Sequence, residues 1–459
     1  MTPRFLIAAA HKSSGKTVIS TGLSRAFRQR GMSVQTFKKG PDYIDPMWLG
    51  LASGRPCYNL DFNTMNEGEV RHLLGSRSDG ADISVIESNK GLYDGVDLHG
   101  TDSNAAMAKL LKAPVVLVVD TTGTTRGIAP LLMGYQAFDK NVNIAGVILN
   151  KTGGARHEGK LRAAVEEYTN IPVLGAVGRS SDLEIGERHL GLTTPSETGM
   201  IQGLIDTLGR RMADSIDLDA LIAIAATAPD LDYRPTTPAD KFATGLRIGV
   251  ARDTAFGFYY PDDFEAFEAA GAELVFFDAI NDAHLPDIDG LFIGGGFPET
   301  SMAKLEANAS IRHEIKQAIE GGLPAYAECG GLMYLCKTLE WQGKQHEMVG
   351  VIPGNAVMCA RPQGRGHTRL SPSDDCLWQI EGGAFKAHEF HYAKIDNLPA
   401  DTKFGFDVKR GAGISGAQDG IVVNNLMAGF CHMRNTASNP WVARFLHHVA
   451  SIKARKNPA

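Results

Sequence analysis

Several common features are missing from this sequence of 459 residues. No apolar run approaches the roughly 20 residues of a membrane span. The six cysteines are scattered, without the CxxC pairs of zinc sites, which is typical of proteins in a reducing cytoplasm. The N-terminal apolar run leads straight into a polar loop and not into a signal-peptide cleavage site. We therefore expect a cytoplasmic protein without a membrane partner.

Two further absences narrow the function. The net charge of −6 lacks the basic excess of a general nucleic-acid binder, so we expect no nucleic-acid partner. No GxGxxG motif follows the first apolar run, which disfavours a dinucleotide-dependent oxidoreductase. Internal repeats are also absent. An apolar fraction of 43% is instead typical of a globular chain, and the length predicts two or three domains.

The first half of the chain alternates short apolar runs with helical stretches. Because most of these runs are continuously apolar, they predict strands buried on both faces of a parallel sheet. The strand candidates are Phe5–Ala10, Ser33–Phe37, Ile83–Glu87, Pro114–Asp120, Ile144–Asn150 and Val173–Val177. The rhythm predicts a doubly wound α/β domain over residues 1–227, with ligands at the carboxyl ends of the strands.

A second α/β domain is predicted after a linker. Residues 228–244 are rich in Pro, Asp and Thr, which indicates an interdomain connection. A second alternation of strands and helices fills residues 245–459. Its predicted strands are Leu246–Ala251, Glu273–Asp278, Gly290–Ile293 and Leu323–Ala327, and its predicted helices are Asp262–Ala270 and most of Ala303–Glu320.

A phosphate loop is predicted near the N-terminus. The apolar strand is followed by a short polar loop, by Ser14-Gly15-Lys16-Thr17 and by an amphipathic helix. Backbone N–H groups and the helix N-terminus would hold ATP phosphates, with Lys16 reaching the β- and γ-phosphates and the Thr17 hydroxyl binding Mg²⁺. The usual pattern has glycine where this chain has Ala10, and a turn that caps a helix is the alternative interpretation.

Polar residues follow several other predicted strands. Lys38 and Asp42 lie in KKGPDYIDP, and Glu87 ends the strand before ESNKGLYDG. Beside a triphosphate, such carboxylates would hold Mg²⁺, and Lys38 would neutralise a phosphoryl or acyl oxygen. Asp120 has the position of a Walker-B acid, and Asn150 that of an adenine-recognition residue. Each position could equally be a turn or a cap, but together they predict one site at one sheet edge.

A cysteine nucleophile is predicted in the second domain. In LPAYAECGGLMYL, a strand ends at Glu328, Cys329 lies at the turn and Gly330 opens a helix. A tight strand-to-helix turn exposes the sulfur, and a helix N-terminus favours a thiolate. In FIGGGFPE, the glycines Gly295 and Gly296 leave backbone N–H groups for an oxyanion, and the Gly330 amide is a third candidate.

The base that would pair with this cysteine is sought among the later histidines. His432 in AGFCHMRNTASNP is favoured, with His388 and His391 in AHEFHY as rivals. The latter two flank Glu389 and could suggest a metal, but no third ligand is evident.

These motifs together resemble the cobyrinic acid (or hydrogenobyrinic acid) a,c-diamide synthase family. The resemblance covers almost the whole chain and is carried by KKGPDYIDP, GLYDG, ERHLGL (Glu187–Leu192), GGGFPE, AECGGLMYL and HEFHY. It implies an N-terminal domain of the dethiobiotin-synthetase type and a C-terminal domain of the class I glutamine amidotransferase type.

The resemblance also implies a coupled reaction. L-Glutamine would be hydrolysed through a thioester on Cys329, with His432 as base. MgATP would phosphorylate a peripheral carboxylate of a tetrapyrrole, and ammonia would then displace phosphate. By this resemblance, Asp42, Glu87 and Thr17 hold Mg²⁺, and Tyr43, Ile44 and Asp94 lie near the tetrapyrrole. A homodimer is the expected assembly.

Two departures from the family pattern leave alternatives open. Ser88-Asn89-Lys90 replaces the usual Gly-x-Met, which resembles a branch that amidates sirohaem in sulfur metabolism. His432-Met433-Arg434 replaces His-x-His and is not His-x-Glu either, so the third member of the Cys–His site stays unassigned. A cobyric acid synthase is disfavoured by KKGPDYIDP. An ATP-dependent tetrapyrrole carrier with an inert amidotransferase domain is disfavoured by the intact Cys329 turn.

Overall fold

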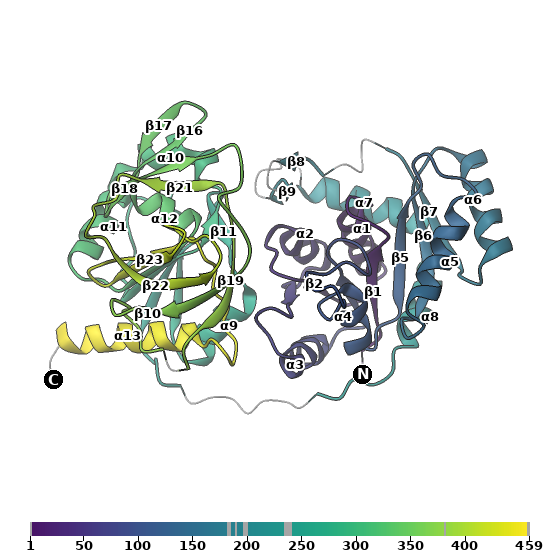
Figure 1. Ribbon diagram of the computed structural model, residues 1–459, viewed down its shortest axis with the longest axis horizontal. Helices are drawn as coiled ribbons and strands as arrows, with labels where there is room; N and C mark the ends of the chain where they lie inside the picture. Colours follow the sequence, from purple (N-terminus) through teal and green to yellow (C-terminus); the bar gives the residue numbers. More distant parts are fainter. Residues whose placement is uncertain are drawn as a thin grey trace. The chain divides into compact units, whose positions relative to one another are not determined.

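The computed structural model describes residues 2–180, 185–188, 191–195, 201–233, 241–380 and 382–456. The chain divides into two compact units, Met1–Thr236 and Thr237–Ala459, and the division falls within the range 228–244. Figure 1 shows the helices and strands of each unit. No helix among the described residues is long and apolar enough to cross a membrane.

The first unit is built on a seven-stranded sheet with the order β3-β2-β4-β1-β5-β6-β7, in which all neighbouring strands are parallel. Its strands are β1 (Arg4–Ala9), β2 (Val34–Lys39), β3 (Tyr58–Leu60), β4 (Ile83–Glu87), β5 (Val115–Asp120), β6 (Ile144–Thr152) and β7 (Val173–Gly178). All six predicted strands are present. The three-residue β3 was not predicted, because it is too short to show a period.

Helices cover both faces of this sheet. They are α1 (Lys16–Gln29), α2 (Ile44–Ser53), α3 (Glu67–Ser78), α4 (Asn104–Leu110), α5 (Ile128–Phe138), α6 (Ala155–Tyr168), α7 (Ile201–Ser215) and α8 (Leu218–Ala226). Alternate residues of β1 point to opposite faces of the sheet. Leu6 packs in one core with α3 to α6, and Phe5 packs in a second core with α1, α7 and α8. Helices α1 and α7 lie side by side (Figure 1). Burial on both faces explains why the strands are continuously apolar.

A short hairpin, β8 (Glu187–Arg188) with β9 (Gly191–Leu192), precedes α7. It belongs to the ERHLGL motif, whose residues 189–190 lie outside the described part of the chain.

The second unit contains a nine-stranded mixed sheet with the order β12-β10-β13-β15-β24-β23-β22-β19-β20. The strands from β12 to β24 pair in parallel, and the remaining strands pair antiparallel. The members of this sheet are β10 (Arg247–Ala251), β12 (Glu273–Phe277), β13 (Gly290–Ile293), β15 (Ala325–Glu328), β19 (Gly364–Pro372), β20 (Phe385–His391), β22 (Lys403–Arg410), β23 (Gln418–Val423) and β24 (Leu426–Gly429).

Two smaller sheets and several helices complete this unit. Strand β11 (Phe256–Phe258) pairs with β14 (Gly295–Gly296), and a four-stranded sheet contains β16 (Cys336–Trp341), β17 (Lys344–Glu347), β18 (Ile352–Met358) and β21 (Ala393–Asp396). The helices are α9 (Pro261–Ala269), the 3-10 helix η3 (Pro298–Ser301), α10 (Met302–Ala307), α11 (Ala309–Glu320), α12 (Gly330–Leu335) and α13 (Trp441–Lys456). Strands β10, β12, β13 and β15 of the large sheet were predicted, but β24 and the antiparallel strands were not.

The predicted helix over Ala303–Glu320 is interrupted. Asn308 separates α10 from α11, with ψ of 66° in place of a helical value. Its side-chain amide donates to the backbone oxygens of Ala279, Ile280 and Asp282, at 2.9 to 3.3 Å. Asn side chains compete with helical hydrogen bonds in this way, so the break has a local cause.

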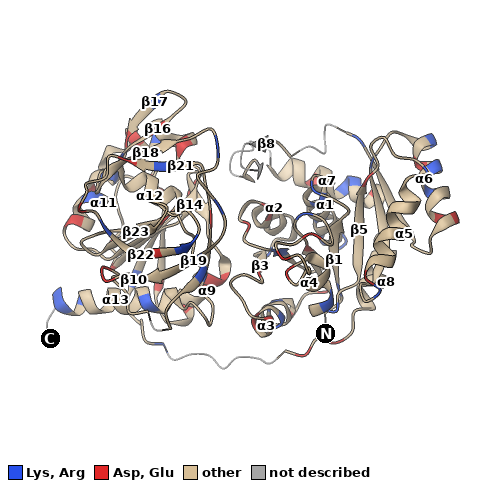
Figure 2. Ribbon diagram, in the orientation of Figure 1, with Lys and Arg blue, Asp and Glu red and all other residues tan. Residues whose placement is uncertain are grey.

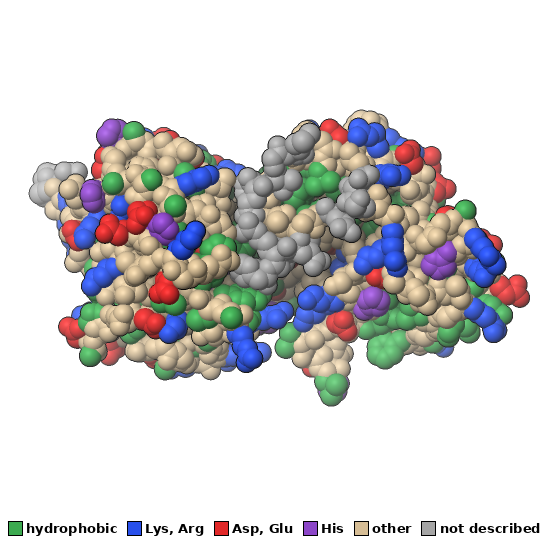
Figure 3. All heavy atoms as spheres, turned by 90° about the horizontal axis from the view of Figure 1, so that it is seen from above, with side chains coloured by type: hydrophobic (Ala, Val, Ile, Leu, Met, Phe, Trp, Pro, Cys, Tyr) green, Lys and Arg blue, Asp and Glu red, His purple; other side chains and the backbone are tan. Residues whose placement is uncertain are grey.

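Charge is distributed over both units. Figure 2 shows acidic and basic side chains on the helices and loops of each unit, and the face in Figure 3 carries both signs of charge on each of them. The basic end of α13 is one example: Lys453, Arg455 and Lys456 lie in its last turn, where cations are favourable beside the exposed carbonyl groups.

Candidate active sites

The loop that follows β1 has a shape that only glycine permits at Gly15. Gly15 has φ of 86° and begins α1, and a Cβ atom there would lie 2.3 Å from Asn150 Nδ2. The Asn150 amide donates to the Ser14 backbone oxygen at 2.8 Å, and the Ser14 hydroxyl donates to the His11 oxygen at 2.8 Å. The loop is therefore braced from the end of β6. A role of Asn150 in adenine recognition stays a prediction.

A second brace comes from Lys151. Its ammonium pairs with the Asp120 carboxylate at 2.9 Å and donates to the Ser13 backbone oxygen at 3.0 Å. Burial opposes the charged carboxylate, but the hydrogen bonds from Lys151 and Thr122 outweigh it and lower the pKa of Asp120 to about 2. In this structure, Asp120 therefore holds the Lys151 ammonium in place, and Lys151 in turn contacts the loop.

Lys16, Thr17, Lys38 and Glu87 meet at the carboxyl ends of neighbouring strands. Lys38 stands opposite Glu87 in the parallel pairing of β2 with β4, and its ammonium lies 2.8 Å from Glu87 Oε1. The Thr17 hydroxyl donates to the same oxygen at 2.9 Å. The Lys16 ammonium donates to the Lys90 backbone oxygen at 2.7 Å. The structure thus brings together four residues that the sequence placed at one sheet edge.

Burial controls the charge of these groups. Lys38 is almost fully buried, and burial alone favours its neutral amine, but Asp45 and Glu87 outweigh this and raise its pKa. Lys16 has no ion pair among the described residues, and the attraction of Glu87, Asp45 and Asp94 is too weak to offset its burial. Burial and the nearby Lys38 lower the pKa of Lys16 to about 8. An anionic ligand at Lys16 would raise this pKa again.

The oxygen atoms here fit a magnesium ion that is shared with phosphate. Glu87 is fully buried, and its Oε2 atom has no hydrogen-bond partner among the described residues. Its Oε1 atom and the Thr17 hydroxyl are in contact. Mg²⁺ takes only one or two protein ligands beside phosphate oxygens and waters. No group of three or more His, Cys, Asp or Glu side chains in the described ranges could hold a metal alone.

Asp42 and Asp45 have different contacts in this structure, and the predicted role of Asp42 toward Mg²⁺ stays a prediction. Asp42 Oδ1 accepts the backbone N–H groups of Ile44 and Asp45, at 3.0 and 3.1 Å, and so starts α2. Its other oxygen is 3.9 Å from the Lys38 ammonium. Asp45, which the site prediction left out, pairs directly with Lys38. The sequence signal that could have identified Asp45 is its spacing in DYID, where the two acids lie about one helical turn apart.

The residues predicted to face the tetrapyrrole flank this cluster. Tyr43 precedes α2 and Ile44 is its first residue. Asp94 accepts the Gly91 N–H at 3.0 Å, which folds the GLYDG loop. A Cβ atom on Gly91 would lie 2.8 Å from the Ala10 backbone oxygen, so this loop packs against the start of the phosphate loop.

Cys329 stands on a tight turn between β15 and α12. Its φ of 47° and ψ of −98° are strained for a residue with a side chain. The two following glycines allow close packing: a Cβ atom on Gly331 would lie 2.3 Å from the Ile293 backbone oxygen, and one on Gly330 would lie 3.0 Å from the Gly296 nitrogen. The local sequence therefore builds the predicted nucleophile elbow.

His432 is the histidine that the fold brings to this elbow. Strands β15 and β24 pair in parallel, with Glu328 opposite Gly429, so the chain after β24 passes beside Cys329. Burial disfavours the imidazolium, but the nearby Cys329 thiol and Glu328 carboxylate outweigh it and raise the pKa of His432 to about 10. The nearest carboxylate distance is 3.3 Å, from His432 Nδ1 to Glu328 Oε2.

The rival histidines have other surroundings. His391 stacks on Phe430, with ring centroids 3.8 Å apart, and its Nδ1 atom lies 2.8 Å from the Ala393 oxygen. His388 stacks against His432 at 5.0 Å, and burial together with the neighbouring His432 lowers the pKa of His388. His388 thus supports the His432 ring.

The three glycines predicted to form an oxyanion site lie around this pair. Gly295 and Gly296 form β14, and Gly330 packs against Gly296. A Cβ atom on Gly295 would lie only 2.6 Å from His432 Cε1. Their role toward an oxyanion stays a prediction. Sequence reasoning missed Glu328 as a partner of His432, although it directly precedes the cysteine.

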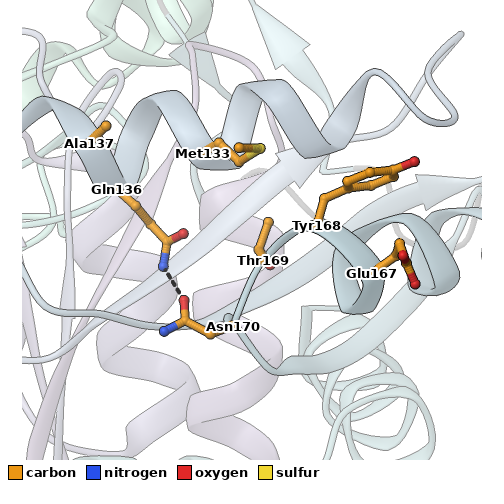
Figure 4. A pocket seen from close by; sticks show the side chains of 7 residues that line it. All are labelled: Met133, Gln136, Ala137, Glu167, Tyr168, Thr169 and Asn170. Carbon is orange, nitrogen blue, oxygen red and sulfur yellow. Dashed lines mark hydrogen bonds between the residues drawn. The ribbon is translucent and has the colours of Figure 1, made fainter.

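A surface hollow of the first unit lies between the ends of α5 and α6. Figure 4 shows its lining, in which Gln136 donates to Asn170 at 2.8 Å. The lining residues are Met133, Gln136, Ala137, Glu167, Tyr168, Thr169 and Asn170. None of the predicted site residues is among them.

Comparison with known proteins follows the same division. Residues 5–192 match the family described as CobQ/CobB/MinD/ParA nucleotide binding domain, and residues 247–440 match the CobB/CobQ-like glutamine amidotransferase domain. A cobyrinate a,c-diamide synthase of Magnetococcus marinus is 44% identical, over 98% of both chains. The chain belongs to the cobyrinate a,c-diamide synthase family.

Other members of this family give the same result. Cobyrinate a,c-diamide synthases of Methanosarcina acetivorans and Archaeoglobus fulgidus are 40% and 39% identical, over 99% and 98% of this chain and 97% and 98% of theirs. The predicted family and the two-domain α/β fold are confirmed. Cobyrinate a,c-diamide synthases are amide-forming ligases that depend on glutamine, so the prediction of a carbon–nitrogen ligase is also confirmed.

Proposed function

We propose that this enzyme uses ATP and L-glutamine to amidate peripheral carboxylates of cobyrinate. The proposal is carried by one observation: a cationic, carboxylate-bearing phosphate loop in one unit accompanies a Cys–His pair in the other. Neither site alone makes an amide from glutamine nitrogen. The names of the relatives support cobyrinate as the substrate.

Glutamine hydrolysis is assigned to Cys329 and His432. The thiolate of Cys329 attacks the carboxamide carbon of glutamine, and His432 gives its proton to the departing ammonia. A thioester between glutamate and Cys329 remains. Water, deprotonated by His432, then cleaves the thioester and releases glutamate. Backbone N–H groups of Gly295, Gly296 and Gly330 would stabilise the oxyanion in both steps.

Amide synthesis is assigned to the phosphate loop and its carboxylates. A carboxylate oxygen of the tetrapyrrole attacks the γ-phosphorus of ATP, ADP leaves, and ammonia then displaces phosphate from the acyl carbon. Lys16 would contact the β- and γ-phosphates, and Lys38 would face the transferred group. Thr17, Glu87 and Asp42 would hold Mg²⁺, which when bound neutralises phosphate charge. Tyr43, Ile44 and Asp94 would position the tetrapyrrole.

Mass spectrometry of tetrapyrroles tests this function. The protein is incubated with glutamine and MgATP and with cobyrinic acid, hydrogenobyrinic acid, sirohydrochlorin or sirohaem. Conversion of a cobyrinate-type substrate to its diamide is the expected result. Amidation of sirohaem alone would contradict it and would make Ser88–Lys90 a substrate determinant. Conversion of none, without glutaminase activity, would instead support an ATP-dependent carrier.

A Cys329→Ser variant separates the two sites. We expect it to lose glutamine-driven synthesis and to keep synthesis driven by added ammonium, because the phosphate loop lies in the other unit. A Cys359→Ser variant is the matched control, since Cys359 is half-buried and lies outside the Cys–His site. If ammonium cannot rescue Cys329→Ser, the division of labour between two sites is wrong.

A further inference from the structure

The histidine of the Cys–His pair needs a group that orients its ring. Typical class I amidotransferases place an acid two residues after the histidine, and this chain has Arg434 there. Arg434 is buried, pairs with Asp262 at 2.7 Å and stacks over Tyr260. A guanidinium cannot accept a proton from an imidazole. The orienting group must therefore come from another part of the fold.

We propose that Glu328, the residue directly before the nucleophile, is the positioning residue that orients His432 toward Cys329. This inference rests on the proposed glutamine hydrolysis. Glu328 Oε2 lies 3.3 Å from His432 Nδ1, and both side chains are almost fully buried. The carboxylate touches the histidine and not the reacting atoms.

The Glu328 carboxylate is itself held in place from two directions. Its Oε1 atom accepts the hydroxyl of Tyr326 at 2.7 Å and the backbone N–H of Met433 at 2.8 Å. Tyr326 lies two residues earlier on β15, on the same face as Glu328, and its ring packs against Trp441 and Phe292. The second bond ties Glu328 to the residue after His432. These contacts leave Oε2 directed at the imidazole.

The strained turn explains how adjacent residues reach the same ring. In an extended strand, Glu328 and Cys329 would point to opposite faces. The left-handed conformation of Cys329, with φ of 47°, ends this alternation and redirects the thiol. The imidazole then has the Glu328 carboxylate at Nδ1 and is also influenced by the Cys329 thiol. The same backbone strain that exposes the nucleophile therefore also assembles its orienting acid.

The chemical consequence is a fixed proton arrangement. A proton held on Nδ1, which faces the Glu328 carboxylate at 3.3 Å, leaves Nε2 to exchange protons with Cys329, ammonia and water. The buried carboxylate also stabilises the imidazolium. Among the described residues, the Cys329 thiol and the stacked His388 also lie against this ring, and the pKa of His388 is lowered by burial and by His432. Glu328 supplies the carboxylate nearest to this ring among the described ion pairs.

A Glu328→Gln variant tests the proposal. The amide has nearly the same shape but presents an NH₂ group to Nδ1, which favours the wrong tautomer of His432. We expect glutaminase kcat to fall by at least about 10²-fold. Synthesis driven by ammonium should be unchanged. Histidine NMR, with the His432 signal assigned from a His432→Asn variant, should show a lower pKa for His432.

Asp419→Asn is the matched control. Asp419 is a buried carboxylate that holds the same segment by accepting the N–H groups of Phe430 and Cys431, both at 3.0 Å. It should lower stability without lowering the pKa of His432. If both variants lose the same glutaminase activity and His432 has the same pKa in both, Glu328 has only a structural role and the proposal is overturned. Full glutaminase activity in Glu328→Gln would also overturn it. Failure of the wild-type protein in both assays would refute the proposed function instead.

Discussion

A methyl group added at Gly295 should disable glutamine hydrolysis and leave amide synthesis from ammonium intact. The Cβ atom of Gly295→Ala would lie 2.6 Å from His432 Cε1. Carbon atoms prefer separations of about 3.5 to 4.0 Å, so the imidazole must retreat by about 1 Å. The ring is stacked between this glycine and its other neighbours, including His388 at 5.0 Å, so it has little room.

The size of the effect follows from this displacement. A misplacement of about 1 Å in a catalytic group costs about 10²-fold in rate, which is about 2.7 kcal/mol of transition-state stabilisation. The substitution retains the backbone N–H of residue 295, so an oxyanion contact there is not removed. We therefore expect glutamine-dependent kcat to fall by about 10²-fold through His432 alone.

Two assays and one control check this reasoning. Glutamine-driven and ammonium-driven amidation are measured on the same preparation, and only the first should fall. Gly405→Ala is the control, because its Cβ atom would meet Met427 Sδ at the same 2.6 Å, in the same unit but against a flexible core side chain. Normal glutamine-dependent rates in Gly295→Ala would refute the placement of His432. Equal losses of the glutamine-dependent rate in Gly295→Ala and Gly405→Ala would refute displacement of His432 as the cause.

Two further predictions concern the phosphate loop. Lys16 has a pKa of about 8 in the free protein, and phosphate would raise it, so ATP binding should take up a proton and weaken as pH rises above about 8. Calorimetry in buffers of different ionisation enthalpy measures this uptake, which should vanish in Lys16→Arg; an unchanged uptake would contradict it. Lys38→Met leaves the Glu87 and Asp45 carboxylates without their buried partner and should lower the free energy of unfolding by about 3–5 kcal/mol in urea titrations. Lys109→Met, at an exposed ion pair, should cost less than about 1 kcal/mol, and equal losses would count against a buried network.

Much of the first unit was predictable because its signals are local. A strand buried on both faces must be apolar throughout, so each central strand of the parallel sheet was visible as a continuous run. The Gly-Lys-Thr loop and the Cys329 elbow depend on residues within one turn of each other. The antiparallel strands of the second unit were missed, because half-exposed strands alternate polar and apolar residues and resemble loops over a few positions.

Sequence alone thus indicated the family and two short turns, the Gly-Lys-Thr loop and the turn at Cys329, since each is encoded in a stretch whose backbone geometry needs particular residues. Only the tertiary structure decided which side chains serve them. Strand pairing sets Lys38 opposite Glu87, and the parallel pairing of β15 with β24 carries His432 to Cys329 across 103 residues (432 − 329). The same pairing of β15 with β24 also brings the Glu328 carboxylate beside His432. Such partners are set by sheet register and by the turn at Cys329, and neither can be read from spacing along the chain.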